Sequence, residues 1–218
     1  MSPIYDCSVE AELLTGMRLA RVAIGRGDLV VVPTDTVYGV AADAFNPSAV
    51  QKLIDAKGRT RQSPPPVLIP GIPTLDALAE SVPDEVRALV AAFWPGGLTI
   101  ILPAQSSLAW DLGETRGTVA LRMPANPITL ELLSETGPLA VSSANLTGEP
   151  AATNARAAEL MLGDSVALYL DDGAGGTLAS TIVDATGLLA PEGKLRIVRD
   201  GVISAADIRD LVGADKCA

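Results

Sequence analysis

The spacing of apolar residues along the chain predicts alternating helices and strands. Apolar positions recur at helical spacing from Leu13 to Ile24, a pattern that Ser8 would cap and Gly25 would end. The continuous apolar run Leu29–Val32 is typical of a buried strand. The remaining pattern predicts helices over 47–57, 84–93, 126–136, 154–162 and 205–212, and strands over 67–69, 98–102, 119–121, 139–141, 166–170, 180–184 and 194–198.

This alternation places the chain in the α/β class, with helices flanking one sheet. A length of 218 residues suits a single domain of that class, and no internal repeat or flexible linker divides it. The glycine-rich segment 173–176 is interpreted as a loop between strands, because it lacks the Gly-Lys-Ser/Thr ending of a phosphate-binding loop.

Composition and charge exclude several classes of function. The formal net charge of -10 argues against non-specific binding to nucleic acid or to anionic membranes, which needs a broad cationic surface, although a local RNA contact stays open. The chain contains no histidine, which excludes Ser-His-Asp and Cys-His catalysis and every metal site that needs imidazole.

The cysteines and the N-terminal segment indicate the cellular compartment of the protein. Cys7 and Cys217 are predicted to be free thiols of a reducing compartment, with a disulfide open if the termini meet. The N-terminal segment lacks the basic and apolar regions of a signal peptide, and no apolar run reaches the roughly 18 residues of a membrane span. We therefore expect a cytoplasmic protein without membrane contact.

Positive charge gathers in one short stretch of this acidic chain. Four cations and the single acid Asp55 lie between Lys52 and Arg61, with Lys57 and Arg59 at a predicted helix end. Such a cluster indicates an anionic ligand that carries phosphate. The alternatives are a solvated surface and capping of the helix C-terminus by cations.

Polar residues stand at the ends of several predicted strands: Thr34-Asp35-Thr36, Arg122, the stretch Ser142–Asn145, and Ser180-Thr181. In open α/β sheets ligands bind beyond strand ends, so these residues are candidates to meet in space. Simple turn formation is the alternative for the hydroxyl-rich segments, and a structural salt bridge is the alternative for Arg122.

Seven motifs follow one another along the chain: PTDTVYGVAADA, KGR, WPGGLTIIL, VALRMP, SSANLTGEPA, STIVD and RDG. In these motifs and their order the sequence resembles the YrdC-type threonylcarbamoyl-AMP synthases. The resemblance covers residues 9–210, expected to form one YrdC-like domain, with 1–8 and 211–218 as terminal extensions. It implies the short single-domain form, a YrdC/RibB-like open twisted mixed sheet around a large concave cavity. The chain departs from the family at Thr60, where proline is usual, and at Pro65, where leucine is usual.

The resemblance implies a reaction and its partners. L-Threonine, bicarbonate and ATP would give threonylcarbamoyl-AMP and pyrophosphate, the first step of a tRNA adenosine modification that a separate tRNA threonylcarbamoyl transferase complex completes. ATP is expected as a substrate, together with Mg²⁺ whose ligands the sequence leaves unknown. One alternative is a paralogue of the same fold that binds nucleotide or double-stranded RNA without this activity. Another is the carbamoyl-transfer module of hydrogenase maturation, which is part of a much longer chain.

The resemblance also implies roles for individual residues. The expected catalytic residues are Lys57, Arg59, Ser143 and Asn145. The expected ATP contacts are Lys57, Arg59, Thr118, Ser143 and Arg199. The expected threonine contacts are Thr34, Arg122 and Ser180, with Arg122 suited to the carboxylate. A chain without histidine suits this chemistry, because the carbamate of threonine attacks ATP and no protein nucleophile is required.

Overall fold

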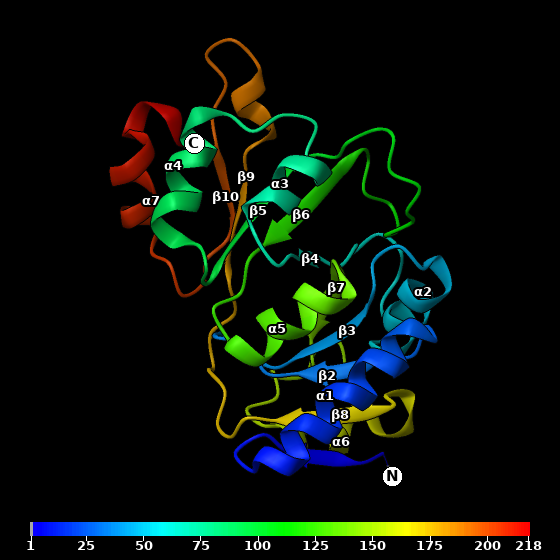
Figure 1. Cartoon of the computed structure of the whole chain (residues 1–218). Coiled ribbons are helices and arrows are strands. Elements are labelled where there is room, and N and C mark those ends of the chain that lie inside the picture. Colours follow the sequence, from blue (N-terminus) through cyan, green and yellow to red (C-terminus); the bar gives the residue numbers. More distant parts are fainter. Residues whose placement is uncertain (1) are drawn as a thin grey trace.

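A computed structural model describes residues 2–218, which form one sheet of ten strands and seven α-helices (Figure 1). The strands are β1 (Ile4–Asp6), β2 (Val30–Val32), β3 (Gly39–Asp43), β4 (Val67–Leu68), β5 (Leu98–Pro103), β6 (Thr118–Arg122), β7 (Leu139–Ser143), β8 (Leu168–Asp171), β9 (Thr181–Asp184) and β10 (Arg196–Arg199). The helices are α1 (Glu10–Gly25), α2 (Pro47–Ala56), α3 (Ile72–Leu78), α4 (Asp84–Phe93), α5 (Pro127–Thr136), α6 (Ala155–Leu162) and α7 (Ala205–Val212). The α/β class and the single mixed sheet are confirmed.

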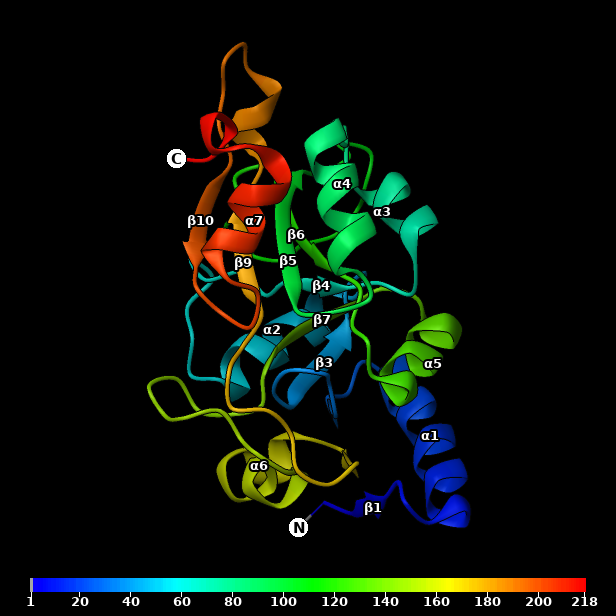
Figure 2. The same cartoon turned by 90° about the vertical axis from the view of Figure 1, so that its left-hand side faces the viewer.

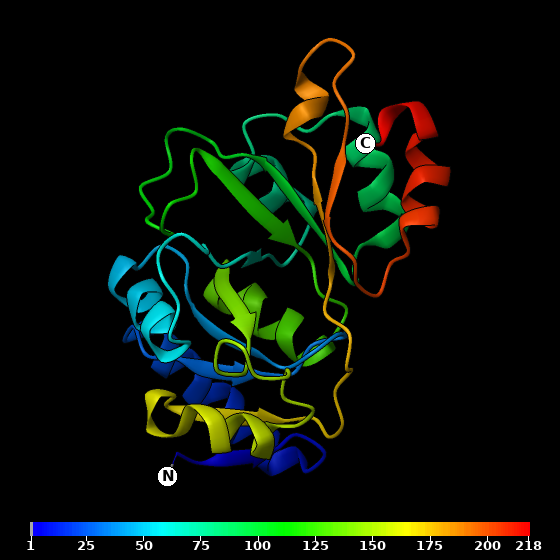
Figure 3. The ribbon, with the colours of Figure 1, turned by 180° about the vertical axis from the view of Figure 1, so that it is seen from behind.

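The sheet order is β1-β8-β2-β3-β7-β4-β6-β5-β9-β10, with both parallel and antiparallel neighbours. We call β1, β8, β2, β3 and β7 the first half and the other five strands the second half. The strands of the two halves run in clearly different directions, so the sheet is strongly twisted (Figure 2). The connection from β8 to β9 runs from one half to the other on one side of the molecule (Figure 3).

Helices cover both faces of the first half. Helices α1 and α5 pack on one face, where Val30 and Val32 join their apolar cluster. Helices α2 and α6 pack on the other face, around Leu29 and Val31. Because successive residues of a strand point to opposite faces, burial on both sides requires the continuous apolar run seen in the sequence.

Helices cover only one face of the second half. The side chains of Leu98 and Ile100 on β5 point to the apolar cluster under α3 and α4, which also takes in Ile208 of α7. The intervening residues Thr99 and Ile101 therefore point to the opposite face, where no helix of residues 2–218 packs and where they line cavities. The face of the second half that lacks helices thus leaves room for cavities.

Several predicted helix boundaries are confirmed by their capping residues. Asn46 accepts hydrogen bonds from the backbone N–H groups of Ser48 and Ala49, and Asn126 and Asn154 cap α5 and α6 in the same way. The prediction that Ser8 caps the first helix is wrong. Its hydroxyl donates to Asp6 at 2.6 Å instead, and Val9 holds the cap position without a side-chain bond.

The sequence pattern missed β1, β3 and α3. Strand β3 consists of Gly, Val, two Ala and Asp, so it lacks the β-branched run by which its neighbours are recognised. Strand β1 pairs with β8 at the edge of the sheet, and near the other chain end an isolated bridge joins Cys217 to Leu195. The domain boundaries at 9 and 210 stay a prediction.

The prediction of two free thiols is confirmed, because Cys7 and Cys217 form no disulfide. The chain ends lie at opposite ends of the molecule (Figure 1). Within residues 2–218, no helix is long and apolar enough to cross a lipid bilayer.

A buried lysine joins α2 to the end of β7. Lys57 follows the last helical residue and is 0% exposed, and Gly58 then ends the helix with a φ of 61° that favours glycine. The Lys57 ammonium donates to the carbonyl oxygens of Ser143 and Asn145 and to Asn145 Oδ1 at 2.8 Å. In return, the Thr147 hydroxyl donates to the Lys57 carbonyl at 2.7 Å. With Ser143 Oγ at 3.5 Å, four protein oxygens surround the buried Nζ, so each of its hydrogens has an acceptor.

Burial of Lys57 predicts a pH-dependent stability. Burial, together with the neighbouring charge of Arg59, lowers the pKa of Lys57 from 10.5 to about 7. Between these values the unfolded chain binds the proton and the folded chain does not, so stability rises with pH. The slope is about 1.4 kcal/mol per pH unit for one proton.

Urea unfolding of the protein and of Lys57→Met at pH 7 and pH 9 measures this contribution. We expect the free energy of unfolding of the unaltered protein to gain on that of Lys57→Met as the pH rises. Lys52→Met is the matched control, because Lys52 is half exposed and pairs with Asp28 at the surface. Parallel pH profiles for the protein and Lys57→Met would contradict the buried titration.

Candidate functional site

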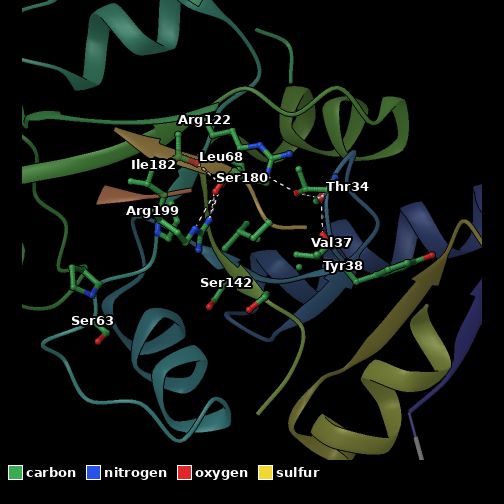
Figure 4. A pocket seen from close by; sticks show the side chains of 18 of the residues that line it. Thr34, Val37, Tyr38, Ser63, Leu68, Arg122, Ser142, Ser180, Ile182 and Arg199 are labelled. Atoms are coloured by element: carbon green, nitrogen blue, oxygen red, sulfur yellow. Dashed lines mark hydrogen bonds between the residues drawn. The ribbon is translucent and has the colours of Figure 1, made fainter. Parts of the chain in front are cut away.

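The polar strand ends surround a cavity of about 180 Å³ between the two halves of the sheet (Figure 4). Its wall includes Thr34 beyond β2, Arg122 at the end of β6, Ser142 and Ser143 at the end of β7, and Ser180 before β9. These segments are far apart in the sequence and meet as expected from their places at strand ends. The geometry therefore favours ligand binding over independent turns.

Three arginines line this cavity, and no acidic residue does. They are Arg59 beyond α2, Arg122 on β6 and Arg199 on β10. Burial lowers the pKa of Arg199, and the positive charges of Arg122 and Arg59 lower it further. A cationic cavity in a chain of net charge -10 is a local feature built for an anionic ligand.

Arg122 is both salt-bridged and on the cavity wall. Its guanidinium donates to Asp35 at 2.7 Å, to the Thr36 hydroxyl at 2.8 Å and to the Gly96 carbonyl at 2.9 Å. Asp35 in turn accepts the backbone N–H of Ala125 at 2.8 Å. Desolvation lowers the pKa of Arg122 while Asp35 opposes that effect. These contacts fix the plane of the guanidinium and leave two of its five N–H bonds without a partner among residues 2–218.

Arg199 and Arg59 are held by neutral oxygens. Arg199 donates twice to the Ser180 carbonyl, at 2.6 and 3.0 Å, and once to the Ser180 hydroxyl at 2.9 Å. Arg59 donates to the Ser142 hydroxyl at 3.1 Å. Among residues 2–218 neither arginine has an ion-pair partner, so their charges are available to a ligand.

Lys57 and Asn145 lie behind the cavity wall, while Ser143 faces the cavity. The Asn145 side chain accepts from Lys57 and donates to the carbonyls of Leu146 and Glu149 at 3.1 and 2.5 Å. Both side chains are thus engaged inside the protein. Their contacts fix the turn that carries Ser143.

Thr118 lies on a second cavity, of about 230 Å³, and its hydroxyl donates to the Thr115 carbonyl at 2.8 Å. Apart from two threonines, the lining of this cavity is apolar: Pro64, Pro65, Pro66, Ile101, Leu112, Thr115, Thr118, Val119, Ala120, Ile182 and Val198. Pro64, Pro66 and Ile182 also line the first cavity, so the proline run forms their common edge.

The cationic stretch does not act as one cluster. Arg61 pairs with Asp111 and donates to Gln51 at 3.0 Å, and Lys52 pairs with Asp28. The interpretation of the stretch as one anion-binding group is therefore wrong for Arg61. Arg59 is the residue of this stretch that reaches the cavity.

Sequence reasoning missed Thr99 and Leu68, which also line the cavity. Both stand in segments, 67–69 and 98–102, that the sequence pattern predicts as strands without a site residue. The hydroxyl of Thr99 inside an otherwise apolar strand was the available signal, since strand residues alternate between faces.

Comparison with known sequences gives one family. The Sua5/YciO/YrdC family model, described as "Telomere recombination", matches residues 22–201. A protein of Mycobacterium tuberculosis (strain H37Rv), provisionally named a threonylcarbamoyl-AMP synthase, is 47% identical over 216 residues, 99% of this chain and 97% of its own length. The threonylcarbamoyl-AMP synthase of Bacillus subtilis is 38% identical over 181 residues, which cover 80% of this chain and 52% of the relative.

The solved structures agree with the sequence matches. The crystal structure of Pyrococcus abyssi Sua5 complexed with L-threonine is similar at a TM-score of 0.87 and 30% identity. The match covers 100% of this chain and 62% of the Sua5 chain. The chain therefore belongs to the Sua5/YciO/YrdC family of threonylcarbamoyl-AMP synthases.

Proposed function

We propose that this protein joins L-threonine, bicarbonate and ATP into threonylcarbamoyl-AMP, with release of pyrophosphate. The cavity lined by three arginines and no acid carries the proposal, because the reaction gathers a carboxylate, a carbamate and a triphosphate in one place. The relatives named for this activity support it.

The amino acid is assigned to Thr34, Arg122 and Ser180. The two free N–H bonds of Arg122 suit a carboxylate, which accepts two parallel hydrogen bonds from a guanidinium. Thr34 and Ser180 place hydroxyls on the same wall. The similar Sua5 structure is complexed with L-threonine, which supports an amino-acid site in this fold.

The triphosphate is assigned to Arg59 and Arg199, whose charges lack carboxylate partners, and the α-phosphate to the hydroxyl of Ser143. The apolar cavity beside Thr118 then takes the nucleoside, since a flat base favours an apolar wall. Lys57 and Asn145 lie behind the cavity wall and position Ser143, because their hydrogen bonds fix the turn that carries it.

The chemistry needs positioning more than a protein nucleophile. The threonine amine attacks the carbon of bicarbonate, and loss of water leaves a carbamate. A carbamate oxygen then attacks the α-phosphorus, and the bond to the β-phosphate oxygen breaks with its electron pair leaving on pyrophosphate. Arg59 and Arg199 stabilise the negative charge that grows on the leaving group.

Residues 2–218 do not offer a cluster of acidic side chains for Mg²⁺. In the described part of the chain no three Asp, Glu, His or Cys residues gather in a metal-binding group, and Asp171 and Asp172 instead accept hydrogen bonds from Tyr38 and Asn126. We propose that Mg²⁺ enters with ATP as part of the substrate, on its phosphate oxygens.

The product is a reactive mixed anhydride, so its consumer must accept an activated acyl group. We propose that a tRNA threonylcarbamoyl transferase complex takes this role. A direct RNA contact of this chain stays a prediction.

Pyrophosphate release with ATP, bicarbonate and single amino acids tests the proposal. We expect release to depend on threonine, and Arg59→Ala to lower its rate by about a hundredfold, the usual effect of removing one charged contact to the transition state. Arg61→Ala is the matched control and should keep the rate, because Arg61 faces Asp111 away from the cavity. Release without threonine, or RNA binding without turnover, would favour the paralogue instead.

Arg122→Lys tests the carboxylate contact. The variant keeps the positive charge but loses the planar fork, so we expect the KM for threonine to rise at least about tenfold while the KM for ATP changes little. Arg87→Lys is the control, since Arg87 forms a surface pair with Asp76. A parallel rise of both KM values would contradict the assignment.

A further inference from the structure

Thr99 lies directly behind one of the proposed substrate contacts. It stands on β5, points to the face that no helix covers, and is 1% exposed. Its Oγ1 lies 2.8 Å from the Ser180 Oγ, and both residues line the first cavity. The proposed reaction uses no group of Thr99.

The hydrogen bonds of Ser180 limit where its own hydrogen can go. Its hydroxyl oxygen accepts an N–H from Arg199 at 2.9 Å, because a guanidinium donates and cannot accept. The remaining contact, with Thr99, admits two arrangements. Either Ser180 donates to Thr99 and its hydrogen turns away from a ligand, or Thr99 donates to Ser180 and the Ser180 hydrogen is free to enter the cavity.

When a hydrogen-bond acceptor binds in the cavity, the surroundings of Thr99 favour one of these two arrangements. Among residues 2–218, Ser180 is the one hydrogen-bond partner of the Thr99 hydroxyl, so the Thr99 hydrogen has a single acceptor. An oxyanion in the cavity offers the Ser180 hydrogen a charged acceptor, and charge-assisted bonds are the stronger ones. The pair then reaches its greatest number of hydrogen bonds when Thr99 donates to Ser180.

We propose that Thr99 is a positioning residue, whose hydroxyl donates to Ser180 and so turns the Ser180 hydrogen toward a carboxylate or carbamate oxygen of the amino acid. This inference rests on the proposed function. We expect Thr99 to affect binding of the amino acid and not of ATP. Arg199, assigned to the triphosphate, is held by three bonds to Ser180, and two of them go to the backbone carbonyl. Substitution at position 99 leaves those two bonds in place.

Thr99→Val tests the inference, since valine keeps the branched shape and removes the hydroxyl. We expect the KM for threonine to rise about fivefold to tenfold, as for one lost hydrogen bond. The KM for ATP should stay within about twofold. Thr99→Ser should restore the threonine KM, which a merely shape-filling role would not predict.

A double-mutant cycle isolates the route of the effect. If Thr99 acts through Ser180, adding Thr99→Val to Ser180→Ala should change the threonine KM no further. Thr136→Val, which removes one hydroxyl bond to the Leu132 carbonyl on α5, is the control for general destabilisation. Thr99→Ala gives a second deletion should Thr99→Val fold poorly.

An active enzyme whose threonine KM is unchanged in Thr99→Val would overturn the inference, as would full additivity in the cycle. Unaltered protein that shows no threonine-dependent pyrophosphate release would overturn the proposed function, and the inference would fall with it. Threonine-dependent pyrophosphate release by the unaltered protein therefore distinguishes failure of the inference from failure of the proposed function.

Discussion

The buried amino group of Lys57 is the constraint on which the site depends. Its hydrogens, out of reach of water, must be met by oxygens, and these come from the backbone and side chain around Ser143 and Asn145. The end of α2 and the end of β7 are thereby held together, although 86 residues separate Lys57 from Ser143. Arg59 follows Lys57 by two positions and so reaches the cavity from this fixed point.

The second constraint is the uneven cover of the sheet. Helices close both faces of the first half but only one face of the second half. The bare face leaves room for two adjoining cavities, one cationic and one largely apolar, with the proline run between them. In the proposed function one nucleotide occupies both cavities, because it has the same division between charged phosphates and an apolar base.

The charge of the first cavity is opposite in sign to the net charge of the whole molecule. The chain has 26 acidic and 16 basic residues, yet the lining of the first cavity contains three arginines and no acid. Arg122 has a carboxylate partner and is a fixed, oriented group, while Arg59 and Arg199 form no ion pair within the described residues 2–218. Mutual repulsion between these cations is relieved when an anion binds, so the free site is prepared for a highly charged substrate.

The sequence by itself determined the α/β class, most helix boundaries and the family, because apolar periodicity, capping residues and motifs are local. It also named Arg122, Ser143 and Ser180, since polar residues at strand ends stand out, and Arg59, since its charge stands out in an acidic chain. Only the tertiary structure decided that Lys57 and Asn145 lie behind the wall, that Arg61 faces Asp111, and that Thr99 supports Ser180. Which side of a strand faces a cavity, and which oxygen meets a buried charge, depend on contacts between distant segments that no local pattern encodes.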